Sequence, residues 1–532
     1  MQKAKMTYKL VKLVNPESRT EWVYADRPKN LTELLNTTVK KYGEQEGLID
    51  ASTRLSYKQV ASSVSNVASA LYYNYGIRKG DRVALMLRNG LEFVISFFAI
   101  AKIGAISVLL NIALKGEELA FQVRDSGPAL LIVEHEFHGL IAEVRSRTRG
   151  VKHIFVTGGE TPAGTIGFSE LLEHGEQAPA EVKMDEMGSA VIMYTSGTTG
   201  TPKGAILSHK GIIASAMNVA QLCDLHVGRD KALIVAPLFH VAGLVMALCS
   251  SIYTGIPVVL MKAFKAANSL KIIEEEGATA MVAVPTIFWL MLNEPEFGKY
   301  NLSSLRFLGA GGSATHEDLL KLCAAKLPGV ELAPGYGLTE ASGMTHSTLS
   351  LDEALSKPGS VGRAVPTVDA KIVDSSGREL PPGETGELLV RGCQVMKEYW
   401  NNLQATRETT ADGWLHTGDI GKITEDGYTY ILDRLKDMII RSGENIYSIE
   451  VENVLYQNPK VLEAAVVGVP DPVFGEQVKA ALMLKPGERA TPEEIQEFCG
   501  KYLANYKVPR YVEFREFLPR NPAGKVIKDE LK

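Results

Sequence analysis

The feature that most constrains the fold is a regular alternation of amphipathic segments with short apolar runs, from residue 31 to about residue 434. The segment LTELLNTTVKKYG at 31–43 has helical periodicity and opens with a helix start signal. Apolar runs such as RVALML at 82–87 and ALLIVE at 129–134 have the length of buried strands. Strands that alternate with helices form largely parallel, helix-covered sheets. The sequence therefore predicts an α/β fold with layered subdomains.

Two later changes of pattern divide the chain further. From about residue 359 to 432, short strands with close turn signals predict a small, mostly antiparallel, β-barrel-like subdomain. Beyond residue 435, helix and strand signals form a compact α+β tail. A chain of 532 residues is too long for a single core. We therefore predict a large N-terminal domain at 1–435 and a small C-terminal domain at 436–532, with a very short connection near Lys436.

Composition excludes several classes of protein. Hydrophobic residues make up 45% and charged residues 22% of the chain, as in ordinary soluble proteins. A net charge of −5 gives no reason to expect a nucleic-acid partner. The five cysteines are scattered without a CxxC pair, which argues against a zinc site or a disulfide framework. This cysteine usage fits the reducing cytoplasm.

No membrane-spanning segment is expected. The N-terminus lacks the continuous apolar core of a signal peptide. Residues 232–261 contain no Asp, Glu, Lys or Arg, and a stretch of that length can span a bilayer. Five residues nevertheless interrupt it: Pro237, His240, Gly243, Gly255 and Pro257. We therefore predict a buried strand, a loop, a buried helix and a second strand.

A loop rich in hydroxyls and glycine, YTSGTTGTPKG at 194–204, lies between the apolar runs AVIMY and GAILS. Its backbone N–H groups and hydroxyls can surround phosphate oxygens, and Lys203 adds a cation. It lacks the G-x-x-x-x-G-K-[ST] order of a nucleoside triphosphate hydrolase P-loop. An isolated cluster of this kind is more often a polar hairpin turn, but the two flanking strands favour a phosphate site.

This loop resembles the phosphate loop of the acyl-adenylate-forming superfamily, which includes acyl-CoA synthetases, adenylation domains of peptide synthetases and firefly luciferase. Five further motifs follow in the family's order: PLFHVAG at 237–243, GYGLTE at 335–340, HTGD at 416–419, DRLKDMIIRSGENI at 433–446 and NPAGKV at 521–526. Together the six motifs span nearly the whole chain. The resemblance is closest to AMP-forming acyl-CoA synthetases, including fatty acid and 4-coumarate ligases.

The resemblance implies roles for residues at an ATP site. In the phosphate loop, the residues expected to hold the β- and γ-phosphates are Thr195, Ser196, Gly197, Thr198, Thr199 and Lys203. In GYGLTE, Tyr336 is expected to stack on adenine, Thr339 to meet the α-phosphate and Glu340 to hold Mg²⁺. Taken alone, this motif also fits a tight turn with a surface glutamate. Gly335 and Gly337 would let the backbone approach a flat ligand.

Further residues match the family's substrate and nucleotide positions. Gly311, in FLGAGGS at 307–313, resembles a residue that flanks adenine. Asp419 and Arg434 resemble the family's ribose-binding pair, although alone they would be a turn residue and a surface cation. The resemblance also suggests an acyl pocket formed by His240, Gly243, Gly309, Ala310 and Gly311. A lone histidine in an apolar segment is more often a core residue, so we assign His240 substrate positioning rather than proton transfer.

The C-terminal motifs imply a mobile domain. Lys525 matches the catalytic lysine, with Lys203 and Thr339 as its partners in catalysis, and Lys436 matches the hinge. Ser442 and Gly443 match the channel for the pantetheine arm of CoA. Two positions depart from the family. Ser448 stands where many relatives have proline, and Ala263 occupies the position of a lysine that contacts CoA in some plant relatives, so Lys262 is one position early.

The function predicted by this resemblance is ATP-dependent activation of a carboxylic acid. The acid attacks the α-phosphorus of ATP, pyrophosphate leaves, and CoA then displaces AMP from the acyl-adenylate. The expected cofactors are ATP, Mg²⁺ and CoA, and the sequence leaves a homodimer open. The segments expected to line the acyl pocket carry no basic residue, which favours a medium- or long-chain fatty acid.

Other functions stay open at this stage. An aryl acid such as coumarate is the second substrate class, and a carrier protein is an alternative acceptor. A luciferase-like oxygenase and a nucleotide-binding protein with an inactive site are less favoured. The presence of Thr199, Lys203, Glu340, Asp419, Arg434 and Lys525 argues against an inactive site.

Overall fold

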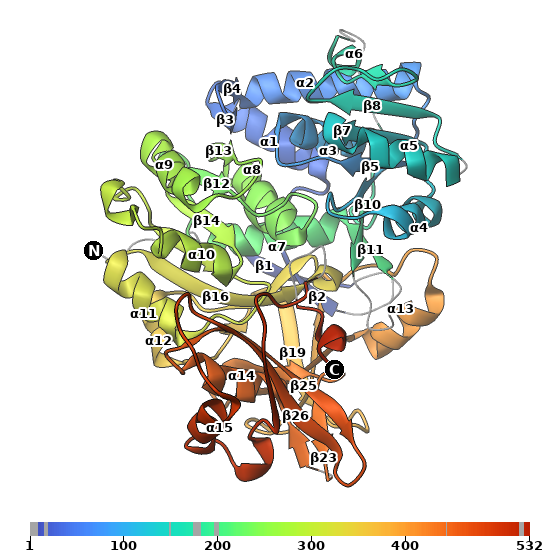
Figure 1. Ribbon diagram of the computed structural model, residues 1–532. Helices are drawn as coiled ribbons and strands as arrows, with labels where there is room; N and C mark the ends of the chain where they lie inside the picture. The colour runs from blue at the N-terminus through green and yellow to red at the C-terminus, as the bar shows by residue number, and fades with distance from the viewer. Residues whose placement is uncertain are drawn as a thin grey trace. The chain divides into compact units, whose positions relative to one another are not determined.

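The computed structural model describes residues 9–14, 20–147, 150–173, 182–195, 202–442, 444–520 and 526–532 (Figure 1). The chain forms two compact units. The large unit comprises Met1–Asp369 and Val390–Leu415, and the small unit comprises Ala370–Leu389 and His416–Lys532. The small β-rich region is thus divided between the two units, with 370–389 and 416–432 in the small one. The boundary expected near Lys436 stays a prediction.

The first main sheet of the large unit has seven strands, parallel except for the edge pair β11–β10. In spatial order they are β11 (Lys203–Ser208), β10 (Ser189–Thr195), β6 (Ile106–Leu109), β5 (Arg82–Met86), β7 (Leu130–Glu134), β8 (His153–Thr157) and β9 (Ile166–Gly167). Helices α4 (Gly116–Ser126) and α5 (His138–Arg147) cover one face, where Val123 and Ile141 share a hydrophobic cluster with Val108 and Leu131. The apolar runs are strands because both sheet faces are buried.

The second main sheet has nine strands, with a parallel centre and antiparallel edges. In spatial order they are β18 (Arg363–Ala364), β17 (Gly343–Ser347), β16 (Glu331–Leu338), β15 (Phe307–Ala310), β14 (Ala280–Ala283), β12 (Ala232–Ile234), β13 (Val258–Leu260), β3 (Glu46–Asp50) and β4 (Thr53–Ser56). Four helices share one hydrophobic core with strands of this sheet: α9 (Ala266–Glu276), α10 (Pro285–Leu292), α11 (Glu317–Lys326) and α12 (Leu351–Ser356).

Further helices connect these two sheets. Helices α3 (Leu91–Lys102) and α7 (His209–Leu222) each contact strands of both sheets. The neighbouring helices are α1 (Leu31–Tyr42), α2 (Tyr57–Ser69), the π-helix η3 (Ala242–Cys249) and α8 (Ser250–Thr254) (Figure 1). The remaining elements of the unit include the hairpin β1 (Leu10–Val14) and β2 (Thr20–Tyr24), α6 (Ser169–Leu172) and α13 (Leu403–Thr409). This layering confirms the predicted α/β class.

The uncharged stretch at 232–261 has the predicted order of strand, loop, helix and strand, namely β12, η3 with α8, and β13. The helical part begins as a π-helix, which the sequence pattern did not indicate. Gly243, the second residue of this helix, packs closely against the preceding loop, since a Cβ there would lie 2.2 Å from the Pro237 carbonyl oxygen. In the described part of the chain, no helix is long and apolar enough to cross a membrane.

The small unit contains most of a four-stranded sheet and a five-stranded sheet. The first has the order β19 (Val368–Val373), β20 (Gly386–Gly392), β21 (Leu415–Ile423) and β22 (Thr429–Arg434). The second contains β24 (Glu444–Ile446), β23 (Ile439–Arg441), β26 (Gly475–Leu484), β25 (Val461–Asp471) and β27 (Tyr511–Phe514). Helices α14 (Ser448–Tyr456) and α15 (Pro492–Gly500) complete its core, and their arrangement is the predicted α+β one.

Candidate active site

The predicted phosphate loop connects β10 and β11, the last two strands at one side of the seven-stranded sheet. Its residues Ser196, Gly197, Thr198 and Thr199 lie outside the described residues. Its two ends are placed: Thr195 closes β10, Lys203 opens β11, and the two residues are cross-strand partners. The antiparallel register therefore holds the first hydroxyl and the lysine of the motif side by side.

Glu340 lies against this loop end. It belongs to the short helical turn η5 (Thr339–Ala341), which directly follows β16 and also contains Thr339. The Glu340 Oε1 atom accepts hydrogen bonds from Thr195 Oγ1 at 3.2 Å and from Tyr399 Oη at 2.8 Å. Both donors use Oε1, so Oε2 has no hydrogen bond or ion pair from the described residues. The structure thus brings Thr195, Lys203 and Glu340 together, as the motifs require.

Tyr399 is a site residue that the sequence reasoning missed. It is 5% exposed, and burial together with the Glu340 carboxylate raises the pKa of its phenol. The phenol therefore stays protonated and donates to Glu340. Its ring centroid also lies 5.3 Å from Lys203 Nζ. The segment around Tyr399 reaches the site by pairing with β11, through Trp400 N to Gly204 O at 2.7 Å, a long-range contact without a local sequence signal.

Two glycine-containing strand ends lie next to each other in the nine-stranded sheet. Gly309 and Ala310 end β15 and pair in parallel with the segment of β16 that leads into Gly335, Tyr336 and Gly337. A Cβ on Gly311 would lie 3.4 Å from the Gly335 carbonyl oxygen. Ligands commonly bind beyond the carboxyl ends of parallel strands. These predicted adenine and acyl residues therefore share one sheet edge.

The backbone at Gly337 is more tightly packed. A Cβ there would lie 2.0 Å from the Gly343 carbonyl oxygen, so only glycine fits this approach. Tyr336 is half-buried, and its ring centroid lies 5.9 Å from that of His346. His346 is fully buried, and burial lowers its pKa to about 3.

His240 follows β12 in a loop that a buried asparagine holds. Asn89 donates to the Ala236 carbonyl at 3.0 Å and accepts from the Leu238 backbone N–H at 2.9 Å. The half-buried His240 ring packs beside Phe239, with centroids 4.7 Å apart. This environment suits a positioning role.

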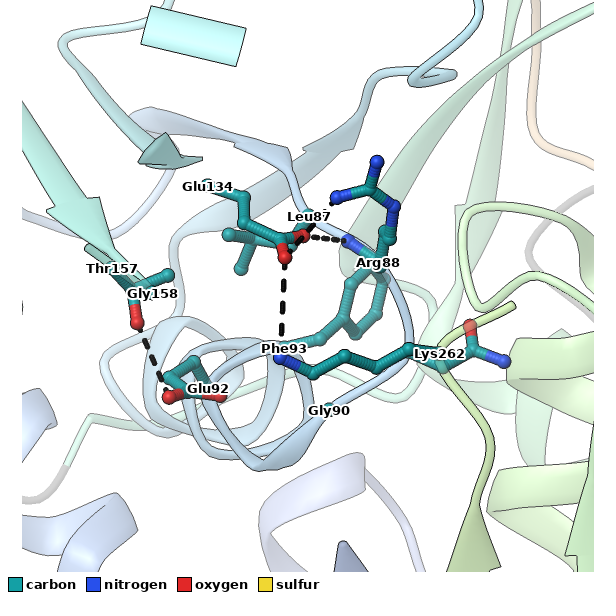
Figure 2. Close-up of a pocket in the computed structure, with 10 residues that line it drawn as sticks. Leu87, Arg88, Gly90, Glu92, Phe93, Glu134, Thr157, Gly158 and Lys262 are labelled. Carbon is teal, nitrogen blue, oxygen red and sulfur yellow. Dashed lines mark hydrogen bonds and ion pairs between the residues drawn. The ribbon is translucent and has the colours of Figure 1, made fainter. Parts of the chain in front are cut away.

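Asn89 also lines a polar pocket. It is lined by Leu87, Arg88, Asn89, Gly90, Glu92, Phe93, Glu134, Thr157, Gly158 and Lys262. Figure 2 shows Glu134 between Arg88 and Lys262. The Glu134 Oε1 atom lies 3.2 Å from Arg88 Nη1 and 3.9 Å from Lys262 Nζ. Thr157 donates to Glu92 at 3.2 Å. Lys262, the residue out of register with the family's CoA contact, is therefore engaged in an ion pair.

In the small unit, Asp419 and Arg434 are cross-strand partners on β21 and β22. The Arg434 Nε atom lies 3.2 Å from Asp419 Oδ1, and Asp419 is buried whereas Arg434 is exposed. The predicted ribose pair is thus assembled. Lys436 follows in an exposed turn, in which the backbone N–H groups of residues 437 and 438 donate to the Arg434 carbonyl.

The other predicted residues of the small unit are only partly placed. Ser442 has a left-handed backbone with φ of 53° and donates its N–H to the Phe474 carbonyl at 2.8 Å. Gly443 and Lys525 lie outside the described residues. The chain on either side of the Lys525 loop is held together, because Arg520 and Val526 form an antiparallel bridge.

Comparisons with known proteins agree with this geometry. The AMP-binding enzyme family model matches residues 35–400, and the AMP-binding enzyme C-terminal domain matches residues 450–525. The chain is 37% identical over 513 residues to the long-chain-fatty-acid–CoA ligase FadD13 of Mycobacterium tuberculosis, covering 95% of this chain and 98% of that relative. It is also 37% identical to a feruloyl-CoA synthase of an Amycolatopsis species, covering 90% and 94%.

Solved structures show the same relationship. The crystal structure of the anthranilate CoA ligase AuaEII in complex with anthranoyl-AMP matches with a TM-score of 0.88 and 30% identity, covering 94% of this chain and 96% of that one. The chain therefore belongs to the AMP-binding enzyme family and is an AMP-forming acyl-CoA ligase, which uses ATP and CoA to activate a small carboxylic acid.

Proposed function

We propose that this ligase activates a fatty acid with an uncharged acyl chain of medium or long length, with Mg²⁺ as its metal. The observation that carries the catalytic part is the convergence of Thr195, Lys203 and Glu340 beside Tyr399. Two hydroxyls orient the Glu340 carboxylate through Oε1. The second oxygen is then available for a cation, and one carboxylate together with substrate phosphates is a usual Mg²⁺ environment.

The donor set fits this metal. Among the described residues, no cluster of three or more His, Cys, Asp or Glu side chains could hold a metal ion. Mg²⁺ does not need such a cage, because it usually keeps waters and phosphate oxygens as ligands. When bound, it would offset the charge of the ATP phosphates. Glu340 would hold it, and Lys203 would add a positive charge at the mouth of the phosphate loop.

The remaining residues orient the reactants, and no enzyme nucleophile is needed. Tyr336 stacks on adenine between Gly311, Gly335 and Gly337, and Thr339 donates to the α-phosphate. Asp419 accepts from the ribose hydroxyls, while Arg434 steadies it across the strand pair. Lys525 offsets charge at the α-phosphate and the substrate carboxylate. Orientation and preorganised charge together supply large rate factors.

The proposed fatty substrate is supported by the apolar surroundings of His240. The π-helix η3 that follows it contains no charged residue. Relatives named long-chain-fatty-acid–CoA ligases match at 35–37% identity. The second candidate is an aryl acid, which the feruloyl-CoA synthase relative favours.

A pyrophosphate-release screen tests the substrate, using saturated acids of increasing length beside coumarate and ferulate, with and without CoA. Each methylene buried in an apolar pocket contributes about 0.8 kcal/mol, so kcat/KM should rise about fourfold per carbon until the pocket is full. A flat profile with strong coumarate activity would establish the aryl alternative. Thioester formation with CoA, followed by mass spectrometry, tests CoA against a carrier protein as acceptor.

We further propose domains at 1–435 and 436–532 that reorient about Lys436 between the two half-reactions, with Ser442 and Gly443 lining the CoA channel. The exposed turn at Lys436 supports this hinge. Substitution Lys436→Pro restricts φ and should leave ATP–pyrophosphate exchange intact while thioester formation drops steeply. An equal loss of both half-reactions would show that Lys436 serves stability instead.

The proposed location is the cytoplasm. All five cysteines, which lie in the described parts of the chain, are free and buried, as suits a reducing compartment. A homodimer stays open, and light scattering of the purified protein would measure it.

A further inference from the structure

Ser448, the residue that departs from the family's proline, lies at the centre of a buried polar chain in the small unit. It begins helix α14 and is 0% exposed. Asp433, on β22 directly before Arg434, is 1% exposed. Lys528 begins the short helical turn η8 (Lys528–Leu531) three residues after Lys525. Ser448 therefore stands between two segments to which the proposed function assigns separate roles.

The hydrogen bonds form one continuous path. Ser448 Oγ donates to Asp433 Oδ1 at 2.8 Å, and the Ser448 backbone N–H donates to Asp433 Oδ2. Lys528 Nζ donates to Ser448 Oγ at 2.6 Å and pairs with Glu452 at 2.8 Å. Glu452 in turn accepts from the Val466 backbone N–H at 2.9 Å. The serine hydroxyl thus acts both as an acceptor, from the Lys528 ammonium, and as a donor, to the Asp433 carboxylate.

The Asp433 carboxylate also organises the local backbone. It accepts from the Arg434 backbone N–H at 2.7 Å, at the end of β22. Helix α14 has no side-chain hydrogen bond from its own N-cap residue, Tyr447. Asp433 supplies that cap from another strand, where a negative charge is stabilised by the helix N-terminus.

Among these groups, only Ser448 forms hydrogen bonds to both Asp433 and Lys528. A proline at this position would have neither the hydroxyl nor the N–H, and the ammonium of Lys528 and the carboxylate of Asp433 would lose their shared partner. Lys525 precedes Lys528 by three residues, a span of at most roughly 10 Å. Lys528 therefore fixes the C-terminal segment that follows Lys525, which itself lies outside the described residues.

We propose that Ser448 is a positioning residue for adenylation, because its hydroxyl couples the strand end that presents Arg434 to the C-terminal segment that follows Lys525. This inference rests on the roles proposed above for Arg434 and Lys525. Misplacement of a catalytic group by about 1 Å can cost roughly a hundredfold in rate. Loss of the hydroxyl should therefore lower adenylation by about ten- to a hundredfold and leave later chemistry intact.

Four variants test the coupling. Ser448→Ala removes the hydroxyl but keeps the N–H, and Ser448→Thr keeps both. Lys528→Met removes the ammonium. The matched control is Lys507→Met, because Lys507 pairs with Glu450 of the same helix α14 at 2.7 Å without touching Ser448. Each variant is assayed by ATP–pyrophosphate exchange and by thioester formation from supplied acyl-adenylate and CoA, with melting temperature as the folding control.

We expect Ser448→Ala and Lys528→Met to lower the kcat of exchange by similar factors, with near wild-type use of supplied adenylate. Ser448→Thr should restore exchange to within about threefold, and Lys507→Met should match the wild type. The double variant S448A/K528M should be no slower than either single one, because both remove the same path. Wild-type exchange by folded Ser448→Ala, or an equal loss in Lys507→Met, overturns the proposal.

A second measurement separates this inference from the proposed function. Amide hydrogen exchange of residues 526–532 should rise in Ser448→Ala and Lys528→Met and stay unchanged in Lys507→Met. This readout needs no substrate, so it decides the coupling even if the wild type accepts none of the acids in the screen, which would instead count against the proposed substrate. Unchanged protection of residues 526–532 in Ser448→Ala shows that no coupling exists.

Discussion

The two units hold their key carboxylates in different ways. In the large unit, Glu340 is held by two neutral hydroxyls, those of Thr195 and Tyr399. In the small unit, Asp433 is held by a hydroxyl that also accepts from the Lys528 ammonium. Both arrangements orient one carboxylate with hydroxyl donors, but only in the second does such a hydroxyl itself accept a hydrogen bond from a cation.

This difference follows from what surrounds each group. The large-unit site is built on strand register and close backbone approach, such as the fit of Gly337 against Gly343. Its geometry therefore persists without ionised partners. The small-unit network instead joins three ionisable groups, those of Asp433, Lys528 and Glu452. We therefore expect backbone changes to disrupt the large unit, and changes of side-chain charge or pH to disrupt the small unit.

The largest effect is expected from Lys525→Ala in the small unit. Loss of one preorganised cation at developing charge typically costs roughly 10²–10³ in rate, or about 3–4 kcal/mol. Adenylation should fall by about that factor, whereas supplied acyl-adenylate and CoA should still react at near wild-type rate, because Lys525 is assigned to adenylation alone. The melting temperature checks folding. A folded variant that fails equally with supplied adenylate would contradict the two-step assignment.

Much of the fold class and of the phosphate-loop site could be predicted from the sequence. The alternation of apolar and amphipathic segments predicted the layered α/β fold, and the motif order predicted the family. Thr195 and Lys203 were expected together because they belong to one local motif. Tyr399 could not be found, because its bond to Glu340 joins residues 59 positions apart. Likewise Ser448 stood out as a departure, but its partner Asp433 is defined only by tertiary packing.

The backbone side of the comparison is tested by Gly337→Ala. The added Cβ would lie 2.0 Å from a carbonyl oxygen, so two strands must separate, and we expect a loss of about 3 kcal/mol in the free energy of unfolding. Gly311→Ala is the matched control, because its Cβ would make an ordinary 3.4 Å contact. That variant should fold within about 1 kcal/mol of the wild type and raise the KM for ATP. Chemical denaturation measures the free energy of unfolding of both variants, and pyrophosphate exchange measures the KM. Equal stability of the two variants would refute the backbone argument.

The charge side is tested by the pH dependence of Asp433→Asn. Burial raises the pKa of Asp433 from 3.8 to about 6, against the opposing effects of Lys528, Ser448 and the Arg434 backbone. Between pH 4 and 6 the folded state therefore holds a proton that the unfolded state releases. Stability from this group is full at low pH and falls as pH rises through 6, by about 2–3 kcal/mol. Asparagine does not titrate. The free energy of unfolding of the wild type should therefore fall relative to that of the variant as the pH rises from 4 to 6.

Hydrogen exchange of residues 448–456, compared between wild type and Asp433→Asn at each pH, isolates this effect from the rest of the chain. The large unit should behave in the opposite sense through His346. Its pKa is lowered to about 3, so its contribution is present above pH 6.5 and is lost as pH falls. A difference between wild type and Asp433→Asn that does not change from pH 4.5 to 7 would remove the contrast between the units.

The smallest effect is expected from Tyr399→Phe, which removes one of the two hydroxyls on Glu340 and keeps the ring beside Lys203. Loss of a group that orients a metal ligand typically costs 10- to 100-fold in metal affinity or activity, and because Thr195 still donates, we expect about tenfold. The Mg²⁺ concentration for half-maximal pyrophosphate exchange should rise by that factor, while stability changes by about 1 kcal/mol. Thr195→Val should act in the same direction, and Thr195→Ser, which keeps the hydroxyl, should remain near the wild type. An unchanged Mg²⁺ dependence in Tyr399→Phe would mean that the neutral hydroxyls do not orient Glu340 for the metal, and the contrast with the charged network around Asp433 would then concern stability alone.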